Sequence, residues 1–303
     1  MRWFESLTSC GYAPKTFAIR GGWFDTLGTN PQSYIEQARQ TVLGGATESF
    51  LFEASALMND SDGGSSTGMA DVAALRQHMA ELQHVAAQVG RRIPIGIAAY
   101  KPPNSHSGYD PNRAGAHTCS ISGDGDEQAL FSFVGMLGLP LLPCASFPDV
   151  SYTGAPLNET LPSAAMFSMH ALKDPLLPRK LRAYIASGRT TLVTDHLAKA
   201  LARQQANVEL SVANVHTLTV GESPAAMLDM PQKSFRALRS AMLKGMGGGA
   251  NFTLQQAPTN FLSFHPFSDG SWVLENFGNY TISAEVNGVQ HEVAARGWQY
   301  EWK

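Results

Sequence analysis

The stretch SAAMFSMHALKDPLLPRKLRAYIASGRTTLVTDHLAKALARQ, residues 163–204, contains two apolar strands that each precede a helix. SAAMFSMHAL (163–172) predicts a buried strand, and residues 175–187 predict a helix that ends at Gly188. RTTLVTD (189–195) predicts a second strand, and HLAKALARQ predicts a second helix. Strands that alternate with helices in this way indicate a parallel sheet.

The same alternation extends on both sides of this stretch. PIGIAAY (94–100) and LPLLPCASF (139–147) predict two strands upstream, and NVELSVANV (207–215) predicts the last strand downstream. A helix over 127–137 is expected between the first two. Five apolar strands separated by helices favour a parallel, doubly wound sheet of the flavodoxin-like kind.

The two ends of the chain have other patterns. Residues 16–24 and 48–57 predict strands, and residues 31–43 and 71–89 predict helices, which makes two βα units before residue 93. Asn30 is the expected N-cap of the first helix, with Pro31 at its first position and Gly44-Gly45 at its end. We therefore expect residues 1–92 to contain two βα units.

After the parallel-sheet domain, expected at 93–225, the pattern changes again. A helix over 234–243, with Ser234 as its N-cap, precedes short alternating segments separated by DG and NG turns. Residues 226–303 are accordingly predicted to be a linker helix plus a small antiparallel β-sandwich domain. The fold class is thus α/β, with a small C-terminal antiparallel β domain.

The composition is that of a compact globular protein. Charged residues make up 16% of the 303 residues and the net charge is −3, so nothing indicates a polyanionic partner such as nucleic acid. The longest apolar segments are too short and too often broken by proline to span a bilayer. Three widely spaced cysteines favour neither a disulfide framework nor a zinc site, and we expect no metal and no cofactor.

The beginning of the chain has no secretory pattern. MRWFESLTSC lacks a cationic segment, an apolar segment and a cleavage site of small residues. A cytoplasmic location is the default expectation. Because Trp3 and Phe4 are typical of the interior of an element, we also expect the chain to begin partway through a larger domain.

Acidic residues near the ends of the first two strands are the candidates for chemistry. Asp25 follows the first strand and Glu53 lies late on the second, and functional side chains of βα barrels lie at the C-terminal ends of strands. Two carboxylates at one mouth suit the hydrolysis of a glycosidic bond. Glu5 is a third candidate. The alternative is that these acids cap helices or pair with arginine, with Arg20 as the ion-pair partner.

Other residues near these acids are candidates for substrate binding. Trp23 and Phe52 offer a stacking surface for a sugar, although aromatic residues in strands more often belong to the core. His106 lies in the long polar loop 101–118, which is either a solvated surface loop or one that overhangs a neighbouring site. The sequons at 158–160, 251–253 and 279–281 carry little weight on their own.

The parallel-sheet domain lacks the marks of a nucleophile-elbow enzyme. The turn SMHALKDP has His170 near the expected elbow but no glycine, which such a sharp turn normally requires. Cys144 lies between Pro143 and Ala145 and has the character of a small buried hydrophobic residue rather than of an activated thiolate. We therefore expect this domain to be non-catalytic.

These parts, in this order, resemble the C-terminal portion of family 42-type β-galactosidases and related clan-A glycoside hydrolases. YIEQARQTVLGGATESFLFEASAL (34–57) looks like the last helix–strand unit of the barrel, where a GA precedes strand eight. The resemblance thus implies that residues 1–92 are the terminal βα units of a (β/α)8-type barrel. Residues 135–148 and 170–201 look like the trimerisation domain, which is similar to class I glutamine amidotransferases. WVLENFGNYTISAEVNG (272–288) resembles the closing β domain.

The resemblance implies a protein that acts on carbohydrate, with a silent middle domain that assembles a homotrimer or dimer. Two departures matter. The family's nucleophile and acid/base are glutamates on barrel strands seven and four, and this chain offers Asp25 or Glu5 instead of a clear match for the first. Its N-terminal part is also too short to hold strand four. Two functions therefore remain open: a glycoside hydrolase or a C-terminal fragment of one, and a non-catalytic scaffold or carbohydrate-binding protein.

Overall fold

The computed structural model describes residues 16–19, 31–45, 48–51, 68–102, 137–144, 147, 161–220, 230–247, 254–256 and 261–303. The chain forms two compact units. The first unit comprises Met1–Pro94, His265–Ser283 and Glu292–Lys303, and the second comprises Ile95–Phe264 and Ala284–His291. The compact units are therefore not consecutive along the chain, because the C-terminal residues return to the unit that the N-terminal residues form.

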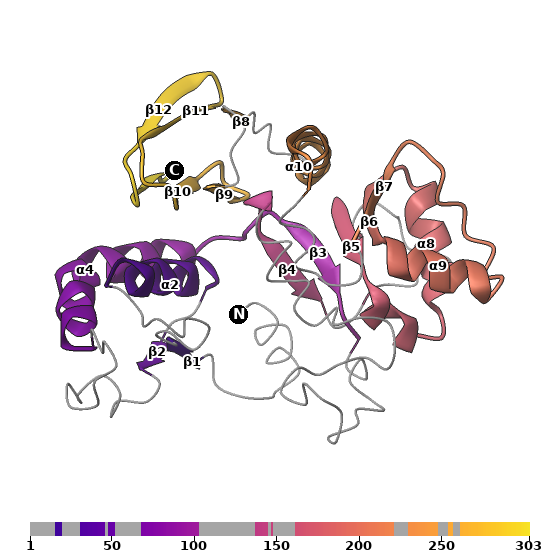
Figure 1. Cartoon of the computed structure of the whole chain (residues 1–303), viewed down its shortest axis with the longest axis horizontal. Coiled ribbons are helices and arrows are strands. Elements are labelled where there is room, and N and C mark those ends of the chain that lie inside the picture. The colour runs from indigo at the N-terminus through magenta and orange to yellow at the C-terminus, as the bar shows by residue number, and fades with distance from the viewer. Residues whose placement is uncertain are drawn as a thin grey trace. The chain divides into compact units, whose positions relative to one another are not determined.

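A five-stranded parallel sheet organises the second unit (Figure 1). Its strands are β3 (Ile97–Tyr100), β4 (Leu141–Cys144), β5 (Ala164–Phe167), β6 (Thr190–Thr194) and β7 (Val215–Leu218), in the order β4-β3-β5-β6-β7. All four neighbouring pairs run parallel. The strand that comes first in the chain lies between the second and the third, which is the doubly wound, flavodoxin-like order. The prediction of a parallel sheet is confirmed.

Helices cover both faces of this sheet. Alternate residues such as Tyr100, Phe167 and Val193 pack against α8 (Leu177–Ala186) and α9 (Asp195–Arg203). The residues between them, including Met166 and Leu192, pack against α10 (Gln232–Met246). The helix that the sequence placed in a linker is thus the second outer layer of a three-layer unit.

The last strand of this unit was predicted in the wrong position. Residues 207–214 form no strand: Asn207 has a φ of 49°, outside the extended region, and the strand begins only at Val215. The alternating apolar side chains of this segment, Val208, Leu210 and Val212, pack as a loop against the face that carries α8 and α9. Burial alone explains their alternation, without any partner strand.

Two element boundaries also differ from the prediction. The strand predicted over 163–172 ends at Phe167 and continues as a 3-10 helix, η2 (Met169–Lys173). Helix α10 begins at Gln232, so Ser234 lies inside it and Pro231 precedes it. Proline fixes φ near the helical value and lacks an N–H, so it fits a helix start without a side-chain cap.

The N-terminal part of the first unit has the predicted order of strand, helix, strand and helix. β1 (Thr16–Ile19) and β2 (Glu48–Leu51) form a two-stranded parallel sheet, and α2 (Pro31–Leu43) and α4 (Gly68–Val89) follow them in turn. Gly44 and Gly45 end α2 by donating their N–H groups to the carbonyls of Gln40 and Val42. Asn30, the expected N-cap, lies outside the described residues.

The C-terminal strands form two small antiparallel sheets, as predicted. One has the order β13-β10-β9 and the other β12-β11-β8. Their bounds are β8 (Leu254–Gln256), β9 (Leu262–Pro266), β10 (Trp272–Asn276), β11 (Ile282–Val286), β12 (Val289–Val293) and β13 (Trp298–Glu301). The predicted NG turn joins β11 to β12, with φ of 53° at Asn287 and 81° at Gly288. Positive φ at both central residues is what a two-residue hairpin turn requires.

The core of the first unit joins segments from the two ends of the chain. Val42 from α2, and Val85 and Val89 from α4, are buried together with Phe267 and Val273. Three aromatic residues of the C-terminus, Trp298, Tyr300 and Trp302, pack against this cluster. Trp298 and Tyr300 lie on one face of β13, and Trp302 follows the strand at the same spacing. The apolar faces of α2 and α4 are therefore covered by the last strands of the same chain.

Candidate functional site

The predicted carboxylate site lies beyond the ends of β1 and β2. These strands are parallel and in register, with Ile19 opposite Leu51, so both end at the same edge of their sheet. In the sequence, Arg20 directly follows β1 and Phe52 directly follows β2. Every predicted site residue lies outside the described residues: Glu5, Arg20, Trp23, Asp25, Phe52, Glu53 and His106. The structure therefore places the strands that lead to this site, while the roles of its side chains stay predictions.

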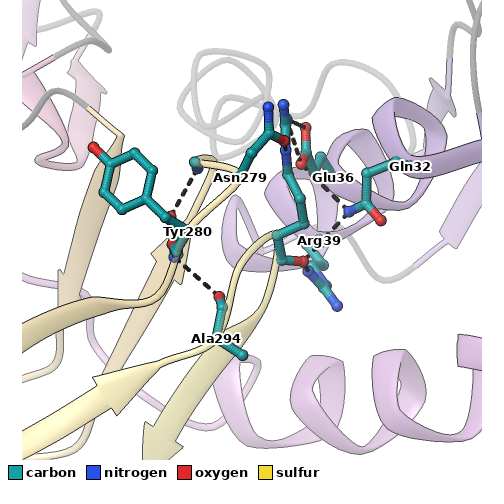
Figure 2. Close-up of polar contacts among 9 residues, drawn as sticks. Gln32, Glu36, Arg39, Asn279, Tyr280 and Ala294 are labelled. Atoms are coloured by element: carbon teal, nitrogen blue, oxygen red, sulfur yellow. Dashed lines mark hydrogen bonds and ion pairs between the residues drawn. The ribbon is translucent and has the colours of Figure 1, made fainter.

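The helix that follows Asp25 in the chain is held by the C-terminal part of the same unit. Figure 2 shows Gln32, Glu36 and Arg39 of α2 near Asn279, with dashed lines for the polar contacts among the residues drawn. The carbonyl of Arg296 accepts hydrogen bonds from Gln32 Nε2, at 3.3 Å, and Arg39 Nη1, at 2.8 Å. Arg296 Nη1 lies 3.0 Å from Glu36 Oε1, and Arg296 Nε donates to Asn279 Oδ1 at 2.8 Å. Arg296 thus binds three successive turns of α2 with its backbone and its side chain.

The conformation of Arg296 is itself unusual. Its φ is 54°, in the left-handed region that residues with a side chain seldom adopt. Its N–H donates to the carbonyl of Gly278 at 3.0 Å, which fixes the backbone in this turn. The strain of the turn is offset by the contacts that the carbonyl and guanidinium make as a result.

A buried asparagine fixes the turn that faces Arg296. The side chain of Asn276 is fully buried and donates to the carbonyls of Tyr280, Val293 and Ala294 at 2.8, 3.1 and 3.0 Å. Its Oδ1 accepts from Gly278 N at 2.7 Å. Two of the residues whose carbonyls accept these bonds, Tyr280 and Ala294, are labelled in Figure 2. Asn276 therefore supplies the partners that the backbone of this bend lacks.

A second polar cluster lies at the carboxyl ends of the strands in the five-stranded sheet. Tyr100, the last residue of β3, donates to Asp174 Oδ2 at 2.8 Å, and Lys180 Nζ lies 2.7 Å from the same oxygen. Asp174 Oδ1 accepts from the N–H of Leu176 at 2.8 Å. Burial favours a higher pKa for Asp174, but these hydrogen bonds outweigh it and hold the pKa below its usual value. The carboxylate is a structural anchor that joins β3, η2 and α8.

Of the groups at this edge that could act as nucleophiles, Ser168 and His170 are buried and Cys144 is half-buried. Ser168 Oγ and His170 Nδ1 lie 2.9 Å apart, and the two residues are 1% and 0% exposed. Burial also raises the pKa of the Cys144 thiol to about 12, so it stays protonated at neutral pH. The rings of Tyr100, Phe147 and Phe167 pack on one another here, with centroids 5.0 to 6.2 Å apart. The described part of this edge is a packed core rather than a catalytic cleft.

Two groups of functional interest were missed from sequence. Glu275 is a fully buried acid on β10, and Arg296 is the polar centre of the turn before β13. Both lie in segments predicted as ordinary small-sheet residues. A weak signal for Glu275 was present, because an acid between Leu274 and Asn276 interrupts an apolar strand on its buried side.

The described residues contain no group of three or more His, Cys, Asp or Glu side chains arranged to hold a metal ion. Within the same part of the chain, every helix is too short or too polar to traverse a lipid bilayer.

The fold defines an α/β protein with a small antiparallel β part. The family described as "Probable glycosyl hydrolase, catalytic domain" matches residues 1–92. No curated protein sequence matches the chain.

A solved structure, a β-galactosidase from Rahnella sp. R3, is similar to this chain with 10% sequence identity and a TM-score of 0.47. The match covers 99% of this chain and 56% of that chain, so this chain spans little more than half of that protein.

Proposed function

We propose that this chain is a glycoside hydrolase, or a large part of one, that cleaves O-glycosidic bonds. The observation that carries the proposal is the pairing of β1 and β2 inside the segment that matches the glycosyl hydrolase catalytic family. The two strands are parallel neighbours, as consecutive strands of a (β/α)8 barrel must be. Catalytic residues of such barrels follow the carboxyl ends of the strands, which here lie at one edge.

Asp25 and Glu53 are the carboxylates that we assign to this edge, with Glu5 as the third candidate. One of the pair acts as general acid on the leaving oxygen, and the other acts as the nucleophile or as the base that activates water. Trp23 and Phe52 supply the apolar surface for a sugar ring, with Arg20 and His106 as polar contacts. A β-galactoside is the first substrate to test, because the chain resembles β-galactosidases of family 42.

The second unit has an assembly role in this proposal. The carboxyl edge of its sheet is filled by Tyr100, Phe147 and Phe167, and its serine and histidine are buried. This packing supports a non-catalytic domain, and the family resemblance adds the expectation that the domain builds a homotrimer or dimer. The same packing also favours the alternative that the whole chain is a scaffold or carbohydrate-binding protein. The two functions differ in one measurable property, which is turnover.

The experiment is hydrolysis of a panel of 4-nitrophenyl glycosides by the purified chain and by Asp25→Asn and Glu53→Gln variants. Loss of a general acid or base lowers the rate by about 10²- to 10⁴-fold. Glu81→Gln is the matched control, because Glu81 is a partly exposed acid on α4 in the same unit. Full activity in both carboxylate variants would remove this site. No turnover of any glycoside, together with retained sugar binding, would favour the scaffold.

A further inference from the structure

Glu275 is a buried carboxyl group with too few hydrogen-bond donors around it to stabilise a negative charge. It lies on β10 with 0% exposure, opposite Trp298 of β13. Its Oε2 accepts a hydrogen bond from Gln40 Nε2 of α2. Its Oε1 is buried and has no hydrogen-bond partner among the described residues. An ionised carboxylate in this position has lost its water and gained a single donor, which is a costly state.

Arg39, the cation that lowers the pKa of Glu275, makes its contacts with other groups. Arg39, on α2, donates through Nη1 to the Arg296 carbonyl at 2.8 Å, and its guanidinium carbon lies 4.9 Å from the centre of the Trp298 ring. Arg39 Nε is buried and has no hydrogen-bond partner in the described structure. The guanidinium therefore has an unused donor while Glu275 has an unused acceptor.

Titratable groups on the neighbouring elements complete the surroundings. Those on the helices and strands packed around Glu275 are Tyr34, Glu36 and Arg39 on α2, Asp71, Arg76, His78, Glu81 and His84 on α4, Tyr300 and Glu301 on β13, and His265 on β9. Arg296, in the turn before β13, pairs with Glu36. His84 and Glu81 act on Tyr300 instead. Burial raises the pKa of Glu275 to about 8, Arg39 and the Gln40 hydrogen bond lower it, and Glu36 raises it.

We propose that protonation of Glu275 controls the packing of α2 against strands β10 and β13. We call this packing interface the seam, and Glu275 its latch. With the proton in place, a neutral carboxyl lies against Gln40 and the helix stays closed on the strands. When the proton leaves, the buried carboxylate has a single hydrogen-bond donor, Gln40, and opening of the seam returns the charge to water. Deprotonation therefore favours the open seam and loosens α2, the helix that follows Asp25 in the sequence. The latch itself does not depend on the proposed hydrolase activity.

The sign of the effect follows from linkage between protonation and opening. In the closed seam the pKa of Glu275 is about 8, against an ordinary value of 4.5 when the carboxyl is exposed. The closed state therefore retains a proton that the open state has lost between these two values. The equilibrium constant for closure is largest below about pH 4.5. It falls roughly tenfold per pH unit between about pH 4.5 and pH 8, and it is constant above about pH 8.

Hydrogen exchange of the full chain tests the latch. The protection factor of the α2 amides, corrected for the chemical pH dependence of exchange, should fall about 400-fold between pH 5 and pH 8. In Glu275→Gln the fall should be absent. Glu292→Gln, an exposed acid on β12 in the same unit, should behave like the parent chain. Helix α8 of the second unit is the internal control and should not respond in this range.

A pH-independent α2 in the parent chain, or an equal fall in Glu275→Gln, would overturn the proposal. If Glu275→Gln does not fold, Arg39→Gln provides the second test. Arg39 lowers the pKa of Glu275. Its removal should therefore raise the pH at which the α2 protection factor stops falling above the value for the parent chain. An unchanged end point in Arg39→Gln would also refute the latch.

Discussion

Replacing Asn276 with alanine should be one of the most damaging single changes to the first unit. The side chain is fully buried and makes four hydrogen bonds, three as donor to carbonyls of residues 280, 293 and 294 and one as acceptor from Gly278 N. Alanine removes all four and leaves the backbone groups of the bend without partners. A buried hydrogen bond contributes about 1 kcal/mol net, and an orphaned buried group costs about 1–3 kcal/mol.

We therefore expect Asn276→Ala to lower the free energy of unfolding by about 4 kcal/mol, a large fraction of the stability of an ordinary domain. Urea titration followed by tryptophan fluorescence measures it, because Trp272, Trp298 and Trp302 lie in this unit. The damage should also reach α2, since the turn that Asn276 holds carries Asn279, the partner of Arg296.

Asn279→Ala is the matched control for this experiment. Asn279 is exposed and accepts one hydrogen bond from Arg296 Nε, so its loss should cost less than about 1 kcal/mol. A loss of under about 1 kcal/mol in Asn276→Ala, or equal losses in the two variants, would refute the assignment of Asn276 as the support of the bend.

Two further predictions concern the second unit. Gly138→Ala should lower its stability by more than about 2 kcal/mol in urea unfolding, because φ is +65° and the new Cβ would lie 2.3 Å from the Leu262 carbonyl oxygen; wild-type stability would show that this approach is absent. Asp174→Ala should lower the free energy of unfolding by about 3 kcal/mol, because it leaves Lys180 and the Tyr100 hydroxyl without the carboxylate that they contact. Because the pKa of Asp174 is lowered on folding, its contribution should be present at neutral pH and be lost as the pH falls below about 4. Thermal unfolding between pH 2 and 7 measures this loss, and an acid profile unchanged in Asp174→Ala would contradict it.

The sequence was most reliable where the deciding interactions are local. Helix α2 runs from Pro31 to Leu43 as expected, and the Asn287-Gly288 turn joins two strands as expected. A proline at a helix start and a glycine at a turn act through the φ of their own residue. The alternation of strands and helices between 94 and 204 also identified the parallel sheet, because each strand carries the apolar pattern of full burial.

The same logic failed at residues 207–215. Alternating Val208, Leu210 and Val212 have the pattern of a strand, yet they cover α8 and α9 as a loop. A pattern of period two reports which side chains are buried, and it does not report whether a neighbouring strand offers hydrogen bonds. The strand begins at Val215, where the backbone pairs with Thr191 of β6.

For the candidate site, the sequence could predict the strands that lead to it but not the contacts that hold the neighbouring helix α2. The strands β1 and β2 and their order were accessible from the sequence, and their parallel pairing agrees with it. The contacts around α2 were not accessible, because the partners Glu36 and Arg296 lie 260 positions apart. No local pattern marks such a pair.

By itself, the sequence determined the helices, most of the strands, their turns and the α/β class of this protein, since each depends on the φ preferences and burial period of nearby residues. Only the tertiary structure decided that the last strands close over α2 and α4 and that Glu275 lies buried between them. The physical reason is that burial depends on which surfaces meet. Trp298 and Val85 are distant in the chain, and they pack in one core because their apolar surfaces are removed from water where they meet.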